Sequence, residues 1–396
     1  MNEFKKLLSL PGPEKKKLGV EYTPAEINQQ PEVWLKAYHI LKEKRDEIEE
    51  FMKEAGLTGE KRATILLSGA GTSEYVGKAA QSVLRKALKR EVISVPSTDF
   101  VSHPRAFIIP GSSYVLVSFA RSGNSPESIA SYNLFDKLSS GSKQIIITSN
   151  RQGELARVAE GDNHTLTIIL PEETNDRSLA MTSSFSTMAF TACGLCFLNR
   201  MEELKSLAAR LGAGARKVMD EYADALKVFI TKPVKRVVYL GAGTLLGTME
   251  ECRLKMLEMT GGIIAANVNS FLGLRHGPQV FVDKDCLVAA SLSTDFYAQQ
   301  YELDLLKELK NKGQGAGILA ICSQATDRIK HVADLVVELF PDGEAIADDY
   351  RIMTDVVAGQ ILALFKSLDI GLKPDNPSVS GTINRVVQGV VIYPFQ

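Results

Sequence analysis

The sequence lacks the features typical of membrane, secreted and nucleic-acid-binding proteins. Its 46 Lys and Arg residues and 47 Asp and Glu residues leave a net charge of −1, so no overall field attracts nucleic acid or an anionic membrane. No apolar run approaches the roughly 18 residues of a membrane span, and the first residues show no secretory apolar stretch. Five scattered cysteines, an odd number, argue against a disulfide scaffold and favour a reducing cytoplasm.

The composition that is present suits a globular chain with two lobes. The 396 residues, 45% hydrophobic and 23% charged, exceed one ordinary core and fit two domains of roughly 150 to 200 residues. Thr23 and Glu26 have capping-box spacing, which predicts a helix start. Apolar residues at three- and four-residue intervals between Pro31 and Ala55 predict a long amphipathic helix. We therefore expect a helical N-terminal leader.

An internal repeat organises the rest of the chain. Leu-Ser-Gly-Ala-Gly-Thr at 67–72 recurs as Tyr-Leu-Gly-Ala-Gly-Thr at 239–244, an offset of 172 residues. Three apolar runs after the first loop have counterparts after the second: 114–118 with 286–290, 145–147 with 318–321, and 167–171 with 336–341. Unbroken apolar strands alternating with helices are typical of buried parallel sheets. The sequence thus predicts a duplicated, doubly wound α/β domain, with a boundary near the small-residue break at 212–214.

The first copy has two candidate ligand loops, each between a predicted strand and a helix, where open parallel sheets bind ligands. Gly71, Thr72 and Ser73 form the first. A dinucleotide fingerprint is a poor match, because it needs glycine where Glu74 stands. The second loop offers four side chains that can donate hydrogen bonds to a phosphate: Arg121, Ser122, Asn124 and Ser125.

An ordinary helix cap is an equal alternative for the second loop, since Pro126 suits a first helical position. The spacing alone does not decide between a cap and a phosphate site. The second copy has Ser-Leu-Ser-Thr-Asp at 291–295 in the matching place. There Asp295 disfavours an anion, so we expect the two copies to differ in role.

The second copy carries titratable residues after its glycine loop. Glu251, Lys255 and Glu258 follow at i, i+4 and i+7 on one predicted helix, which on its own indicates a surface Glu–Lys pair. His276 lies between glycine-rich turns and raises the possibility of catalysis, although a lone histidine is more often structural. The hydroxyls at 181–187 either contact a polyol or cap a helix. The Cys-x-x-Cys at 193–196 has no second pair to complete a metal site, and small buried residues are the better interpretation.

Several motifs together resemble a known family. The paired glycine loops, Arg-Ser-Gly-Asn-Ser at 121–125 and Arg-His-Gly-Pro at 275–278 resemble the paired sugar-isomerase domains of the amidotransferase that makes glucosamine 6-phosphate. The segments 174–184 and 380–389 are more similar to its relatives, the tagatose-6-phosphate ketose/aldose isomerases or galactosamine-6-phosphate deaminases. The resemblance implies a leader at 1–45, sugar-isomerase domains at 46–211 and 212–372, and a tail closing the active site at 373–396.

The resemblance also implies roles for individual residues. It assigns the substrate to a set of loop and tail residues: Gly71, Thr72, Ser73, Arg121, Ser122, Asn124, Ser125, Thr182, Ser183 and Gln388. Glu258 becomes the base that moves a proton between C1 and C2, Glu251 assists at the sugar oxygens, and His276 of a neighbouring subunit opens the ring. A carboxylate base needs no metal or other cofactor for this chemistry.

The sequence departs from the amidotransferase at three points. Ala120 replaces a serine of the phosphate loop, and we expect Arg121 to substitute for it. The lysine that forms an imine with the sugar falls on Gln388, so that covalent step is not implied. The glutaminase half and its cysteine nucleophile have no counterpart, and we expect no synthesis from glutamine.

The sequence therefore predicts a cytoplasmic homodimer or higher homo-oligomer that isomerises and deaminates an amino-sugar 6-phosphate. Galactosamine 6-phosphate is the preferred candidate substrate, with tagatose 6-phosphate plus ammonium as the products. A plain sugar-phosphate aldose/ketose isomerase is the first alternative. A sugar-phosphate-sensing regulatory protein is the second, and it would not need Glu258 and His276. We expect neither nucleic acid nor membrane as a partner.

Overall fold

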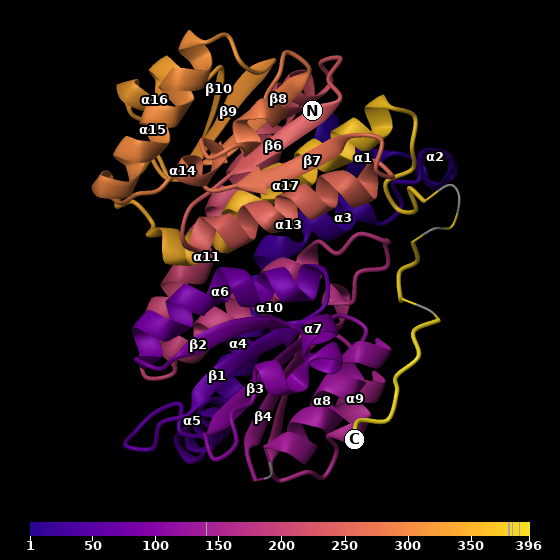
Figure 1. Cartoon of the computed structure of the whole chain (residues 1–396). Coiled ribbons are helices and arrows are strands. Elements are labelled where there is room, and N and C mark those ends of the chain that lie inside the picture. The colour runs from indigo at the N-terminus through magenta and orange to yellow at the C-terminus, as the bar shows by residue number, and fades with distance from the viewer. Residues whose placement is uncertain (140, 379–380, 382, 388) are drawn as a thin grey trace. The chain divides into compact units, whose positions relative to one another are not determined.

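The computed structural model describes residues 1–139, 141–378, 381, 383–387 and 389–396. The chain forms two compact units, each built around one sheet (Figure 1). The N-sheet unit comprises Glu32–Asp176, Ser183–Ala208 and Ile383–Gln396. The C-sheet unit comprises Met1–Pro31, Arg177–Thr182 and Ala209–Thr382.

The N-sheet unit contains five parallel strands in the order β2-β1-β3-β4-β5. The strands are β1 (Thr64–Gly69), β2 (Val92–Pro96), β3 (Tyr114–Ala120), β4 (Lys143–Thr148) and β5 (Thr165–Ile169). Its helices are α4 (Gln30–Glu43), α5 (Arg45–Glu54), α6 (Thr72–Leu88), α7 (Ser97–Ser102), α8 (Pro126–Leu138), α9 (Glu154–Val158) and α10 (Ser183–Gly194). All seven residues of β3 are buried, as expected for a central strand covered on both faces.

The C-sheet unit repeats this arrangement, with the order β10-β9-β8-β6-β7. The strands are β6 (Arg236–Leu240), β7 (Ala265–Asn269), β8 (Cys286–Ser291), β9 (Gly317–Cys322) and β10 (Leu335–Glu338). Its helices are α1 (Glu3–Ser9), α2 (Gly12–Leu18), α3 (Thr23–Asn28), α12 (Ala223–Ile230), α13 (Thr244–Met259), α14 (Phe271–Leu274), α15 (Phe296–Asn311), α16 (Asp327–Val332) and α17 (Asp348–Asp369), and α11 (Met201–Lys217) extends into both units.

The predicted duplication is confirmed by both sheets. Read from β1 and from β6, the two strand orders are the same. The glycines before α6 and α13 share one conformation, with φ 57° and ψ −125° at Gly71 and φ 55° and ψ −129° at Gly243. Positive φ of this kind favours glycine, which explains why the Gly-Ala-Gly motif occurs twice.

The units do not follow the predicted leader, domain and tail in chain order. α1 packs on α12 and α3 packs on α17, so Met1–Pro31 belongs to the C-sheet unit instead of standing apart. The segment Ile383–Gln396 belongs to the N-sheet unit. The bounds 1–45, 46–211, 212–372 and 373–396 therefore stay a prediction about sequence domains.

Three local predictions differ from the structure. The single helix expected over 31–55 is divided at Lys44, where no glycine or proline marks the break. The helix start predicted from Thr23 and Glu26 is confirmed, since α3 begins at Thr23, but Thr23 does not cap this helix: its N–H and hydroxyl both donate to Asp375 at 2.7 Å. The small residues at 212–214 lie inside α11, where Gly214 makes room for Phe340: a Cβ there would come 2.4 Å from the ring.

The core of the C-sheet unit holds the segment with the predicted catalytic residues. α13 and α17 pack side by side along their lengths (Figure 1). A Cβ on Gly359 of α17 would come 2.3 Å from the sulfur of Cys252, so glycine allows this close approach. Within the part of the chain that the structure describes, no helix is both long and apolar enough to cross a bilayer.

Candidate active site

The glycine loop of the N-sheet unit brings backbone and hydroxyl groups to the start of α6. Gly69 approaches the following helix so closely that a Cβ would lie 2.5 Å from the backbone carbon of Ser73. Thr72 and Ser73 begin the helix and are buried. The first N–H groups of a helix have no partner within it, so this end of α6 favours an anion.

The second loop of the N-sheet unit lies between β3 and α8. Ser125 takes the N-cap position with extended backbone, and Pro126 begins the helix, but the Ser125 hydroxyl makes no capping hydrogen bond. The Ser122 hydroxyl accepts from the N–H of Asn124 at 3.3 Å. The cap interpretation therefore describes the backbone of Ser125 and not its hydroxyl.

The neighbouring loop at Asn150 and the first turn of α9 fix the shape of this second loop. The side-chain amide of Asn150 donates to the carbonyl of Ser122 at 2.8 Å, and the N–H of Leu155 donates to the carbonyl of Gly123 at 2.8 Å. The side chain of Asn124 accepts from the N–H of Glu154 at 2.9 Å. These bonds hold the loop in place before any ligand arrives, which lowers the cost of binding.

Arg121 extends from the same loop and is buried, with 6% of its surface exposed. Its guanidinium donates to the backbone carbonyl of Arg385 in the C-terminal segment. Arg385 in turn donates to the side chain of Asn175 at 2.7 Å and to the carbonyl of Asp176 at 2.8 Å. The C-terminal segment thus reaches the second loop, whereas the candidate Gln388 lies outside the described residues.

The C-sheet unit shows what the equivalent positions hold in the second copy. Thr294 stands 172 residues after Ser122, and its N–H and hydroxyl donate to one oxygen of Asp348 at 2.8 and 2.9 Å. Thr244 stands 172 residues after Thr72, and its hydroxyl donates to Asp349 at 3.0 Å. In the second copy, carboxylates from the first turn of α17 therefore accept the hydrogen bonds of Thr244 and Thr294. The counterparts of these two donors in the first copy are Thr72 and Ser122.

Asp295 does not have the role expected from its sequence position, which was to disfavour an anion in this loop. Its carboxylate accepts from the N–H of Ala298 at 2.9 Å and caps α15. The two copies do differ, as expected, but Asp348 and not Asp295 fills the second anion position.

Glu251, Lys255 and Glu258 form a buried cluster on α13. The Lys255 ammonium lies 3.2 Å from a Glu251 oxygen and is hydrogen-bonded to Glu258. Glu251 and Lys255 are fully buried, and the Glu258 side chain keeps 21% exposure. Burial disfavours the ammonium, but the two carboxylates outweigh it and raise the pKa of Lys255. The interpretation as a surface pair was wrong.

Sequence reasoning did not single out Lys255 as a candidate site residue. The signal was its position between two glutamates one helical turn away on either side. Its burial comes from tertiary packing that the sequence does not show, because α13 packs against α17, β6 and β7.

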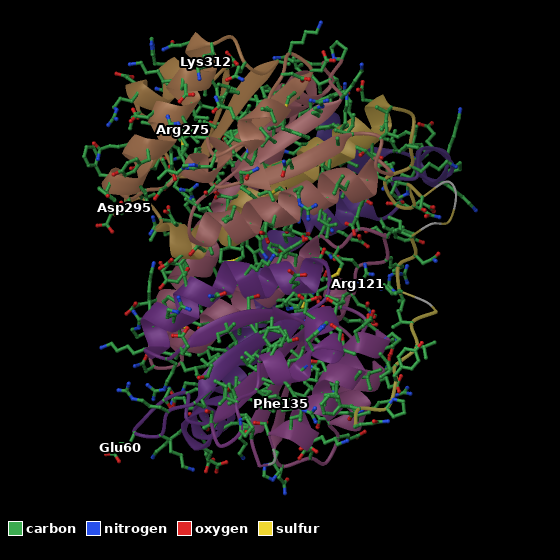
Figure 2. The ribbon with its side chains drawn as sticks, viewed as in Figure 1. Glu60, Arg121, Phe135, Arg275, Asp295 and Lys312 are labelled. Carbon is green, nitrogen blue, oxygen red and sulfur yellow. The ribbon has the colours of Figure 1, made fainter. Side chains whose placement is uncertain are left out.

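His276 lies on an exposed loop of the C-sheet unit, just after α14. The preceding Arg275 (Figure 2) is fixed by Glu308 at 2.9 Å, and Gly277 follows with φ 117°. Leu272 and Val280 expose 47% and 87% of their surfaces on either side of the histidine. His276 thus stands among exposed apolar residues.

Comparison with known proteins identifies the family of this chain. Residues 58–195 match the SIS (sugar isomerase) domain. The D-galactosamine-6-phosphate deaminase AgaS of Escherichia coli is 35% identical over 378 residues, which cover 95% of this chain and 96% of that protein. The chain belongs to the AgaS family.

Solved structures agree with the AgaS assignment. The tagatose-6-phosphate ketose/aldose isomerase of Escherichia coli has a TM-score of 0.84 and 31% identity, over 94% of this chain and 97% of that one. The C-terminal domain of glucosamine-fructose-6-phosphate aminotransferase from Francisella tularensis shares the fold at 20% identity, with a TM-score of 0.73 over 90% of this chain and 98% of that one.

Two candidate residues of this AgaS-family chain have structural partners. The hydroxyl of Ser183 donates to Asp176 at 2.5 Å, and the N–H and hydroxyl of Ser184 donate to the same carboxylate at 2.9 and 2.6 Å. Asp176 thereby caps α10, a role that sequence reasoning missed. Thr182 is buried, and its carbonyl accepts from Gln360 at 3.3 Å. A substrate-binding role for Thr182 and Ser183 stays a prediction.

Proposed function

We propose that this chain is an isomerising deaminase that converts galactosamine 6-phosphate to tagatose 6-phosphate and ammonium. Its 35% identity to AgaS deaminase over almost the whole chain supports the substrate class. The observation that carries the proposed chemistry is the buried Glu251–Lys255–Glu258 cluster, in which one partly exposed carboxylate is fixed by an ammonium.

The proposal assigns the sugar phosphate to the two loops of the N-sheet unit. The donors are Gly71, Thr72, Ser73, Arg121, Ser122, Asn124 and Ser125. Support comes from the second copy, in which Thr244 and Thr294 hold carboxylates at the positions of Thr72 and Ser122. Each hydrogen bond to a charged phosphate oxygen contributes about 1.5–3 kcal/mol.

Glu258 acts as the base in this proposal. It removes the proton from C2 of the open-chain aldehyde and returns a proton to C1, while the amino group loses one proton and the aldehyde oxygen gains one, so that C1 becomes an alcohol and C2 an imine. Water adds to the imine carbon, and the C2–N bond breaks to give the ketose and ammonium. The step needs only a positioned carboxylate, which contributes about 10²–10⁴-fold.

Lys255 and Glu251 support that base. The Lys255 ammonium bonds Glu258 and so orients its carboxylate, while Glu251 balances the buried positive charge. Glu251 also assists at the sugar oxygens in this proposal. Removing Lys255 would leave Glu251 buried without its counter-ion, which is costly for any buried charge.

We further assign ring opening to His276 acting in a homodimer. The exposure of His276 and of the apolar Leu272 and Val280 beside it supports a contact with a second copy. The proposed enzyme works in the cytoplasm, and the imine hydrolysis makes it a hydrolase as well as an isomerase.

An ammonium-release assay tests the function. Purified protein is incubated with galactosamine 6-phosphate and glucosamine 6-phosphate, and ammonium and ketose 6-phosphate are measured together. Equal amounts of ammonium and tagatose 6-phosphate from galactosamine 6-phosphate are expected. Ketose formed from a hexose 6-phosphate that has no amino group, with no ammonium from either amino sugar, would establish the plain isomerase instead.

A further inference from the structure

Phe395 of the C-terminal segment is held at one point of the N-sheet unit by two cations. Its ring lies 4.9 Å from the Arg105 guanidinium and 5.5 Å from the Lys137 ammonium. The same cations bind the adjacent backbone: Lys137 donates to the Phe395 carbonyl at 2.7 Å, and Arg105 donates to the Gln396 carbonyl at 3.0 Å. The ring also packs on the cluster that contains Phe135 (Figure 2). Three polar or cation–π contacts and one apolar contact thus converge on Phe395, and a fourth polar contact holds the adjacent Gln396.

The same segment is held a second time at Arg385. The backbone carbonyl of Arg385 accepts from Arg121 of the phosphate loop, and its side chain bonds Asn175 and Asp176. Arg121 directly precedes Ser122. Arg385 is therefore bound at the proposed phosphate site, whereas Phe395 is bound by α8 and the 3₁₀ helix Pro104–Ala106.

Between the two holds the described residues form neither helix nor strand. Val391 and Tyr393 expose 65% and 80% of their surfaces. The described side chains between Arg385 and Phe395 are mostly exposed, so this segment is held mainly at its two ends. The position of Arg385 therefore depends in part on the contacts of Phe395. A short tether keeps a group at high local concentration near its partner and loses this effect when one end is released.

We propose that Phe395 is a positioning residue for substrate binding: its anchor keeps the Arg385 carbonyl on Arg121, and so holds the Arg121 guanidinium ready for the phosphate. The inference rests on the proposed phosphate site. It assigns no contact between Phe395 and the substrate. Releasing the anchor adds the cost of ordering the segment to each binding event, and leaves the proton-transfer groups of α13 unchanged.

The test compares Phe395→Ala with Tyr393→Ala, which removes an exposed aromatic ring two residues away. We expect Phe395→Ala to raise KM for the amino-sugar phosphate about tenfold, the factor that corresponds to about 1.4 kcal/mol, with kcat within about twofold. Tyr393→Ala should keep both values. Arg105→Gln, which removes one cation and leaves the apolar packing, should raise KM in the same direction.

Inorganic phosphate provides a readout that does not depend on turnover. Its affinity, measured by titration calorimetry, should fall in Phe395→Ala by a factor similar to the rise in KM and stay unchanged in Tyr393→Ala. Wild-type KM and phosphate affinity in both Phe395→Ala and Arg105→Gln would overturn the anchor while leaving the deaminase proposal intact. Absence of turnover in the wild-type enzyme would instead refute the function, and the phosphate titration would still decide the anchor.

Discussion

Thr294 donates both its N–H, at 2.8 Å, and its hydroxyl, at 2.9 Å, to one oxygen of Asp348. The second oxygen of Asp348 accepts from Ser293, and Arg351 lies behind the carboxylate at 3.4 Å. The second copy of the domain thus contains its own anion, supplied by α17, at the position that corresponds to Ser122. The loop geometry is suited to an anion in both copies, and the first copy supplies none of its own at Ser122 among the described contacts.

Replacing Asp348 with Ser should destabilise the C-sheet unit, because several donors and Arg351 lose a charged acceptor. The expected loss in the free energy of unfolding is about 2–4 kcal/mol, measured by urea denaturation. Formate, which has the same charged group, should restore part of it. Asp342→Ser, in an exposed position of the preceding loop, is the control. Equal stability of the two variants would show that the carboxylate contributes nothing.

The proposed phosphate loop of the first copy gives the second prediction. Replacing Ser122 and Ser125 together with Ala removes two hydrogen bonds to a charged ligand, roughly 3–6 kcal/mol if they add. KM for the sugar phosphate should rise by at least about 10²-fold, with a much smaller change in kcat. The steady-state rates give both constants. An unchanged KM would move the phosphate to other residues.

Glu258 on α13, the proposed base, gives the third prediction. Glu258→Gln keeps the size of the side chain and removes its charge, so turnover should fall by at least about 10²-fold while substrate binding persists. Deuterium incorporation from solvent into the sugar, followed by NMR, should fall by the same factor. Exchange at the wild-type rate would reduce Glu258 to a structural partner of Lys255.

How much of the fold and of the candidate site can be predicted from the sequence depends on how far apart in the chain the interacting residues lie. The duplicated strands and glycine loops could be predicted, because both are short local patterns repeated at one offset. The partner of Thr294 could not, since Asp348 lies 54 residues further along the chain and nothing local pairs them. Lys255 shows the same limit, because its spacing was visible but its burial depends on the packing of α13 against α17, β6 and β7.

Glu302 makes the fourth prediction, which concerns pH. It is buried, and its one bonded oxygen accepts from the N–H of Ser293 at 2.8 Å, while the other has no partner among the described residues. Burial raises the pKa of Glu302 from 4.5 to about 7, helped by Asp348 and Asp295 and opposed by the Ser293 bond and Arg351. The folded state therefore binds this proton more tightly than the unfolded state does.

The sign of the effect follows from that difference. Between pH 4.5 and about 7 the unfolded chain has lost the proton and the folded chain retains it, so this group lowers stability as pH rises. Its contribution amounts to about 3 kcal/mol and approaches completion as pH rises past the folded pKa of about 7. Glu302→Gln should remove this part of the pH dependence, and urea denaturation at pH 5 and pH 8 measures it. Parallel stability profiles for variant and wild type would show that Glu302 titrates normally.

The proposed homodimer gives the fifth prediction. If the partner's His276 completes the site that contains Glu258, then Glu258→Gln and His276→Asn homodimers are each nearly inactive. Mixing them under conditions of subunit exchange gives mixed dimers in which one of the two sites has both groups intact. In a fully exchanged equimolar mixture about half of the dimers are mixed, so roughly a quarter of wild-type activity should return under two-fold symmetry.

An arrangement within one subunit predicts a different result, because neither variant chain carries both wild-type groups and no mixed dimer then contains a complete site. Mass spectrometry of differently tagged subunits verifies the exchange, so that a lack of recovered activity does not reflect incomplete exchange. Recovery near a quarter places His276 at the subunit contact, where its exposure and the exposed Leu272 and Val280 already suit a second copy. No recovery after complete exchange would assign His276 to its own subunit or remove it from the reaction.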